Sequence, residues 1–92
     1  MEYGPDDDLI HGGPVPVYRQ LAEILRARIE RGDWKPNRPL PGEQRIADEF
    51  GIARLTVRKA VHVLADEGVV FVVPQRGTFV SPGDHPSESG EE

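Results

Sequence analysis

Two short helical patterns that meet at a glycine constrain the fold of this chain most strongly. "GEQRIADEF" has apolar residues at helical spacing, and Gly51 follows it directly. The helical spacing resumes within three residues in "RLTVRKAVHVLADEG", whose apolar positions recur at i, i+3, i+4 and i+7. Glycine readily adopts the left-handed conformation that ends a helix. Two helices joined by so few residues predict a helix-turn-helix corner.

A longer helix is predicted before this corner, over residues 17–31. Its apolar residues follow the amphipathic pattern, with Pro16 suited to its entry and Gly32 suited to its C-terminal cap. The next segment, "DWKPNRPLPGE", has three prolines and a glycine and therefore cannot be helical throughout. We expect Leu40 to lie in a short strand within it.

After Gly68 the apolar period changes from helical to extended. "VVFVV" and "TFV" are β-branched and aromatic, and the intervening "PQRG" contains turn residues, so the two runs predict a β-hairpin. The predicted order is helix, linker, helix, helix, hairpin. The fold class is therefore α+β, a winged helix-turn-helix of three helices and a small β-hairpin wing.

Charge divides the chain into a folded body and two acidic ends. Residues 1–13 and residues 83–92 each hold four acidic residues and no lysine or arginine. Residues 14–82 hold all eleven Lys and Arg against eight Asp and Glu, although the whole chain has a net charge of −5. Both ends are rich in Gly, Pro and acids. We predict a disordered acidic arm over 1–13, one domain over 14–82, and a disordered acidic tail over 83–92.

Several classes of function are disfavoured by what the sequence lacks. There is no cysteine, and His11, His62 and His85 are scattered, so we expect no metal site and no cofactor. No glycine-rich phosphate loop and no His–acid pair beside a nucleophile are present, so we expect no enzyme. No apolar run could span a bilayer and no signal-peptide pattern begins the chain, so we expect a cytoplasmic protein without a membrane partner.

Two arginines lie one helical turn apart in the second helix of the corner. Arg54 and Arg58 fall on the side opposite the apolar residues, where an arginine fork can match the N7 and O6 acceptors of guanine. A helix-turn-helix corner alone is also common in small helical domains without such a role. A rival interpretation is a winged helix used as a protein-interaction module, which the acidic overall charge favours.

Three motifs between Pro16 and Val80 match a known pattern: "LPGEQRIADEFGIARLTVRKA", "LADEG" and "RGTFV". They are similar to L-P-S-E-x-x-L-A-x-x-F-G-V-S-R-x-T-V-R-x-A, to L-x-x-E-G and to the wing motif G-x-G-T-F-V of the GntR family of bacterial transcription regulators. The region from Pro16 to Val80 therefore resembles the N-terminal winged-helix domain of that family. Four positions depart from the pattern: Gly42 and Ala53 replace hydroxyl residues, and Pro74-Gln75 precedes the wing's basic residue in place of Gln-Gly.

The resemblance implies a set of DNA-facing residues on the corner and the wing. They are Gln44, Ala53, Arg54, Leu55, Thr56, Arg58, Arg76 and Gly77. Gln44 is expected at a phosphate or at N6 and N7 of an adenine, and Thr56 at a phosphate. Leu55 is expected at an apolar base edge such as a thymine methyl, and Arg76 in the minor groove. Tyr18 and Arg19 are weaker phosphate candidates.

The resemblance also implies a mode of action. We expect a repressor that binds double-stranded DNA as a homodimer on a palindromic operator, in association with the nucleoid. Family members usually continue into a C-terminal domain that binds an effector and dimerises. A small-molecule effector is therefore implied only if such a domain belongs to this protein.

Overall fold

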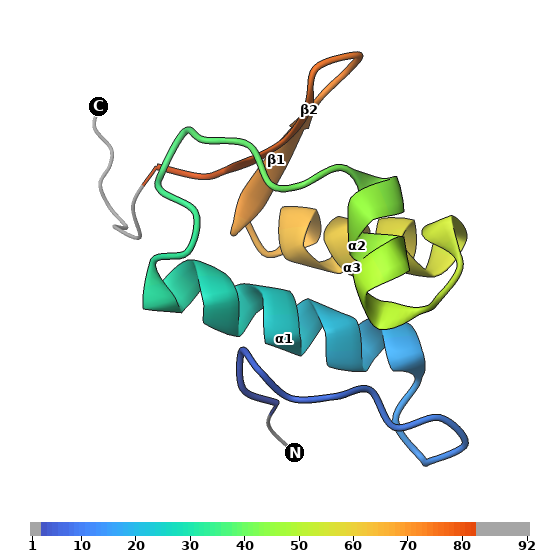
Figure 1. Ribbon diagram of the computed structural model, residues 1–92. Helices are drawn as coiled ribbons and strands as arrows, with labels where there is room; N and C mark the ends of the chain where they lie inside the picture. The colour runs from blue at the N-terminus through green and yellow to red at the C-terminus, as the bar shows by residue number, and fades with distance from the viewer. Residues whose placement is uncertain (1–2, 83–92) are drawn as a thin grey trace.

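The computed structural model describes residues 3–82, which form three helices and a two-stranded antiparallel hairpin (Figure 1). The helices are α1 (Val17–Arg31), α2 (Glu43–Phe50) and α3 (Arg54–Asp66), and the strands are β1 (Val70–Val73) and β2 (Gly77–Val80). The element order is the one predicted for a winged helix-turn-helix. Residues 83–92, for which a disordered tail was predicted, lie outside the described residues.

Helix α1 ends at a left-handed glycine, as its sequence predicts. Gly32 has a φ of 94°, and its N–H donates to the carbonyl oxygens of Arg28 and Ile29. A residue with a Cβ would be strained in this conformation. On the inner side of the helix, Leu21 and Leu25 are fully buried and anchor α1 in the core.

The corner between α2 and α3 depends on Gly51. This residue has a φ of 66°, and its N–H closes the end of α2 by donating to the carbonyl of Ala47. The N–H of Ile52 donates to the same carbonyl at 3.0 Å, which turns the chain sharply before Ala53 begins α3. This turn brings the first residues of α3 beside the first residues of α2, where Glu43 contacts Arg54 and Arg58.

The hairpin is joined to the linker by an isolated β-bridge. Val70 pairs with Val80 and Val73 with Gly77, so the tip consists of residues 74–76. On the other edge of β2, Pro39 forms a bridge with Phe79. The N–H of Leu40 donates to the carbonyl of Thr78 at 2.8 Å, but the pairing is limited to the bridge at Pro39, and Leu40 does not lie in the short strand that its sequence predicts.

One core joins the helices to the base of the hairpin. Helices α1 and α3 pack against each other, α2 covers α3, and the ends of the two strands close the remaining side (Figure 1). Among residues 3–82, twelve buried apolar residues form this cluster: Leu21, Ala22, Leu25, Leu40, Ile46, Ala47, Val57, Ala60, Val61, Leu64, Val70 and Val80. The hairpin tip projects away from this core into solvent (Figure 1).

Residues 3–13, here called the N-terminal strap, lie along α1 instead of forming the disordered arm expected from composition. The buried side chain of Gln20 explains much of this difference. Its amide accepts from the N–H of Ile10 at 2.7 Å and donates to the carbonyl of Ile10 at 2.8 Å and to that of Val15 at 2.8 Å. Arg31 adds an ion pair with Asp6 at 2.9 Å. These tertiary contacts override the local composition, which predicts only a solvated chain.

Candidate nucleic-acid interface

The outer face of α3 is a stripe of exposed residues opposite the core. Its members recur at i, i+4 and i+8, and they are Arg54, Leu55, Arg58, Lys59 and His62. The side opposite this stripe is anchored by Val57, Ala60, Val61 and Leu64, all of which are buried. The first half of the helix thus presents three cations to solvent, Arg54, Arg58 and Lys59, and the spacing of the two arginines predicts this exposure for them. Lys59 was not among the predicted site residues, although the same periodicity places it on this stripe.

The start of α3 has no side-chain cap. Ala53 is in an extended conformation and accepts from the N–H groups of Thr56 and Val57 through its carbonyl, but it offers no side-chain acceptor to the helix. The first N–H groups of a helix carry a partial positive charge and favour an anion. The loss of the hydroxyl cap at this position therefore leaves the start of α3 receptive to a phosphate oxygen.

A carboxylate from α2 holds Arg58 in place. Arg58 donates from Nε to Oε2 of Glu43 at 3.1 Å and from Nη2 to Oε1 at 2.9 Å. An arginine has five N–H donors, so three remain, two on Nη1 and one on Nη2. These three are the donors at the end of the guanidinium, where a pair of adjacent acceptors such as guanine N7 and O6 can be bound. Glu43 therefore orients Arg58 without consuming its outer donors.

Glu43 and Arg58 each favour the ionised form of the other. The hydrogen bonds from Arg58 hold the pKa of Glu43 below its ordinary value, against an opposing effect of burial. Arg54 also lies 4.0 Å from Oε1 of Glu43 and contributes to the same lowering of that pKa. Glu43 raises the pKa of Arg58 in return. Both members remain ionised at neutral pH. The partnership was not anticipated, because Glu43 and Arg58 are 15 residues apart and no local pattern links them.

The other predicted residues of the corner lie in the first turns of α2 and α3. Gln44 is exposed in the first turn of α2 and donates to Oδ1 of Asp48 at 2.8 Å. Thr56 is half-buried, whereas Leu55 exposes 64% of its surface. Leu55 and Arg54 are therefore both accessible at the helix start, and the side-chain amide of Gln44 keeps a second N–H besides the one that it donates to Asp48.

The wing residues lie at the tip of the hairpin. Arg76 is exposed, and its backbone N–H donates to the carbonyl of Val73 at 3.0 Å, which closes the turn. Gln75 has a φ of 67° and Gly77 a φ of 124°, so the residues on either side of Arg76 both adopt a positive φ. Pro74 occupies the turn, where its missing N–H costs no ladder bond.

Arginines of α1 are neutralised by nearby acids. Arg26 pairs with Glu23 and Glu67, and Arg28 pairs with Glu49 at 2.7 Å. Tyr18, at the start of the same helix, is different. The Arg19 guanidinium lies 5.7 Å from its ring centroid and the Lys59 ammonium lies 5.8 Å from it. The start of α1 thus joins the basic stripe of α3, while the rest of α1 carries balanced charge.

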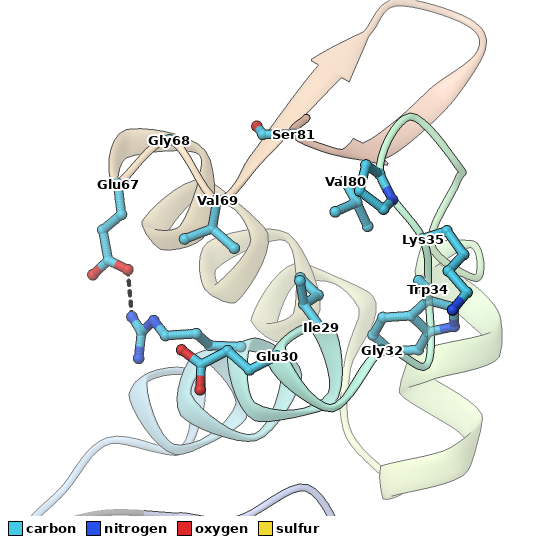
Figure 2. Close-up of a pocket in the computed structure, with 12 residues that line it drawn as sticks. Ile29, Glu30, Gly32, Trp34, Lys35, Glu67, Gly68, Val69, Val80 and Ser81 are labelled. Carbon is cyan, nitrogen blue, oxygen red and sulfur yellow. Dashed lines mark hydrogen bonds and ion pairs between the residues drawn. The ribbon is translucent and has the colours of Figure 1, made fainter. Parts of the chain in front are cut away.

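A separate hollow of about 600 Å³ lies at the far end of α3 from Arg54 (Figure 2). Trp34, Ile29 and Val69 supply its apolar walls, and the ion pair between Arg26 and Glu67 borders it (Figure 2).

Across residues 3–82, no group of three or more His, Cys, Asp or Glu side chains is arranged to hold a metal ion. In the same part of the chain, no helix is long and apolar enough to cross a membrane.

The three-helix core, the glycine corner and the hairpin define a winged helix-turn-helix domain. Residues 17–80 match the family described as "Bacterial regulatory proteins, gntR family". The chain belongs to the GntR family, and the predicted resemblance is thereby confirmed. The matched domain is therefore that of a family of regulatory proteins, as the resemblance implies.

Relatives of known name share about three quarters of the chain. It is 46% identical over 68 residues to the HTH-type transcriptional repressor NagR of Bacillus subtilis. It is 40% identical over 68 residues to the mannosyl-D-glycerate transport/metabolism system repressor MngR of Escherichia coli. Each alignment covers 74% of this chain but only 28% of the relative. The chain therefore spans little more than a quarter of the length of these relatives.

Solved structures share the fold. YtrA from Sulfolobus acidocaldarius, a GntR-family transcription factor, is 32% identical, with a TM-score of 0.73 over 84% of this chain and 81% of that one. The DNA-binding domain of AraR in complex with operator ORX1 is also 32% identical, with a TM-score of 0.72 over 82% of this chain and 99% of the AraR chain. The predicted fold class is confirmed.

Proposed function

We propose that this chain is the sequence-specific, double-stranded-DNA-binding domain of a transcriptional regulator, with residues 14–82 as the binding unit. The observation that carries the proposal is the outer face of α3. There Arg58 is oriented by Glu43, and Arg54 and Leu55 are exposed beside it at an uncapped helix start. The operator complexes of the AraR domain, which has the same fold, support this interpretation.

In this proposal the start of α3 enters the major groove. Arg58 binds guanine N7 and O6 through its outer donors, and Arg54, whose side chain is 55% exposed, reaches a neighbouring base or phosphate. The backbone at Ala53 and the hydroxyl of Thr56 approach a phosphate. The cations around Tyr18 add contacts to the same backbone, because they are continuous with the stripe.

The remaining predicted residues flank this central contact. Gln44 binds a phosphate or adenine from the start of α2. Arg76 reaches the flanking minor groove from the hairpin tip, and Gly77 lets the backbone approach the duplex closely. The two groups of contacts would fix both the register and the orientation of the domain on the duplex.

We further propose that the protein is a repressor that acts as a homodimer on an inverted repeat, in the cytoplasm at the nucleoid. The names of NagR and MngR as repressors support the first part. A two-fold operator follows if two copies bind with the symmetry that is usual for helix-turn-helix dimers. Control by a small-molecule effector requires a further C-terminal domain.

The test is a titration of the 92-residue chain into fluorescent duplexes at several salt concentrations. One duplex is enriched by the protein from a random pool, and the other is a shuffled duplex of the same length and composition. We expect preference for the enriched duplex, and a linear fall of log affinity with log salt concentration on both. If no sequence is enriched and both duplexes bind equally weakly at low salt, DNA recognition is refuted and a protein-interaction module becomes the better interpretation.

A further inference from the structure

One apolar side chain on α3 is not explained by the core. Four large apolar residues are exposed among residues 3–82: Ile10, Leu55, Phe71 and Val72. Leu55 is the most exposed of them, at 64%. An isolated exposed leucine is ordinary on a protein surface. Leu55 is notable for its position, because it is the second residue of α3 and lies between the two arginines of the proposed DNA-facing surface.

The neighbours of Leu55 limit what it can bind. Arg58 is three residues later, so the two side chains lie on the same side of the helix with Cβ atoms about 5–6 Å apart. Glu43 holds the Arg58 guanidinium, so Leu55 has an oriented polar group beside it. A site that combines an arginine fork with an adjacent apolar side chain matches a guanine next to an apolar group on a base edge.

We propose that Leu55 contacts the C5-methyl group of a pyrimidine in the major groove, either thymine or 5-methylcytosine. In the major groove the C5-methyl is the apolar feature of the base edges, and the other readable groups are donors and acceptors. Stacked base pairs are 3.4 Å apart, so the 5–6 Å between Leu55 and Arg58 places the methylated pyrimidine within two base pairs of the guanine bound by Arg58. This inference rests on the proposed function and makes that function sensitive to cytosine methylation.

The expected effect follows from the burial of one methyl group. Removing a buried methyl reduces affinity about fourfold. The loss is confined to one base position in each half-site, because a single leucine contacts a single methyl. This loss of affinity depends on the side chain of Leu55, so Leu55→Ala should bind thymine and uracil equally well at that position.

The experiment uses the duplex enriched by the full 92-residue chain. Each thymine is replaced in turn by deoxyuridine, which lacks only the C5-methyl, and affinity is measured by fluorescence anisotropy. The proteins are the wild type, Leu55→Ala, and the matched control Ile10→Ala, which shortens an apolar side chain that is 54% exposed on the N-terminal strap. We expect one position per half-site where deoxyuridine reduces affinity about fourfold for the wild type and the control but not for Leu55→Ala.

A second set of duplexes separates the two sources of the methyl group. At the sensitive position the T·A pair is replaced by C·G or by 5-methylcytosine·G, and the methylated form should bind the wild type about fourfold more tightly than the unmethylated form. Equal binding of these two duplexes would overturn the 5-methylcytosine part of the proposal.

Two other results would overturn the whole inference. Deoxyuridine could have no effect at every thymine, or it could reduce the affinity of Leu55→Ala as much as that of the wild type. Failure to enrich any sequence would instead refute the proposed function itself, and the inference with it.

Discussion

Replacing Glu43 with glutamine tests whether a carboxylate prepares Arg58 for recognition. The substitution preserves the size of the side chain but removes its charge and the two-oxygen acceptor that now binds Nε at 3.1 Å and Nη2 at 2.9 Å. Arg58 would then sample more rotamers in the free protein and would have to be ordered on binding. Ordering a long side chain at an interface reduces affinity roughly two- to tenfold, and this is the loss expected on the enriched duplex.

The shuffled duplex should respond in the opposite direction. Removing a negative charge next to the phosphates changes the net charge from −5 to −4 and should strengthen nonspecific binding slightly. Asp33→Asn is the matched control, because it makes the same change of charge and also removes a carboxylate that binds an arginine, Arg31, at 2.7 Å. Both variants are titrated into both duplexes by fluorescence anisotropy. The reasoning is refuted if the ratio of enriched to shuffled affinity is unchanged in Glu43→Gln, or if it falls equally in Asp33→Asn.

Three further predictions concern the domain that carries the site. Leu64→Ala removes a fully buried side chain from α3 and should lower the free energy of unfolding by about 2–5 kcal/mol, measured by urea titration of Trp34 fluorescence; a loss below about 1 kcal/mol would contradict the described core. Gln20→Ala should cost about 1–3 kcal/mol and speed hydrogen exchange at the Ile10 amide, whereas unaltered exchange would mean that the strap is held by other contacts. The lowered pKa of Glu43 means that its ionised form stabilises the folded state fully above its ordinary pKa of 4.5, and that this contribution is lost as the pH falls below that value. In Glu43→Gln, the free energy of unfolding should therefore fall less steeply as the pH drops below about 4.5, measured by urea titrations at several pH values. An unchanged fall of the free energy of unfolding below about pH 4.5 would contradict the ion pair.

Much of the fold was predictable because local rules and the core agree. Gly32 and Gly51 end their helices in the left-handed conformation that glycine favours, and the change of period after Gly68 does mark the hairpin. The packing of the N-terminal strap on α1 was not predictable, because an acidic, glycine-rich composition is typical of a solvated chain. Its position depends on hydrogen bonds between the buried Gln20 and the backbone of Ile10, together with contacts from Arg28 and Arg31 in the last turn of α1.

The site was predictable where it depends on helical periodicity. The spacing of Arg54 and Arg58 correctly placed both side chains on the outer face of α3, and the same rule would have included Lys59. The ion pair between Glu43 and Arg58 required the corner to be folded, because it joins two helices through a turn whose angle no local pattern specifies. Whether each predicted residue contacts DNA remains part of the proposal.

The most direct test of DNA recognition by α3 is the specificity of Arg58→Ala. Arg31→Ala is its matched control, because the side chains of Arg58 and Arg31 are 45% and 44% exposed and both form ion pairs. Affinity for the enriched and the shuffled duplex is measured for each variant and for the wild type. Arg58→Ala should lose about tenfold or more of the preference for the enriched duplex, and Arg31→Ala should keep it. Equal losses on both duplexes in Arg58→Ala would contradict base recognition and would mean that Arg58 contacts only phosphates.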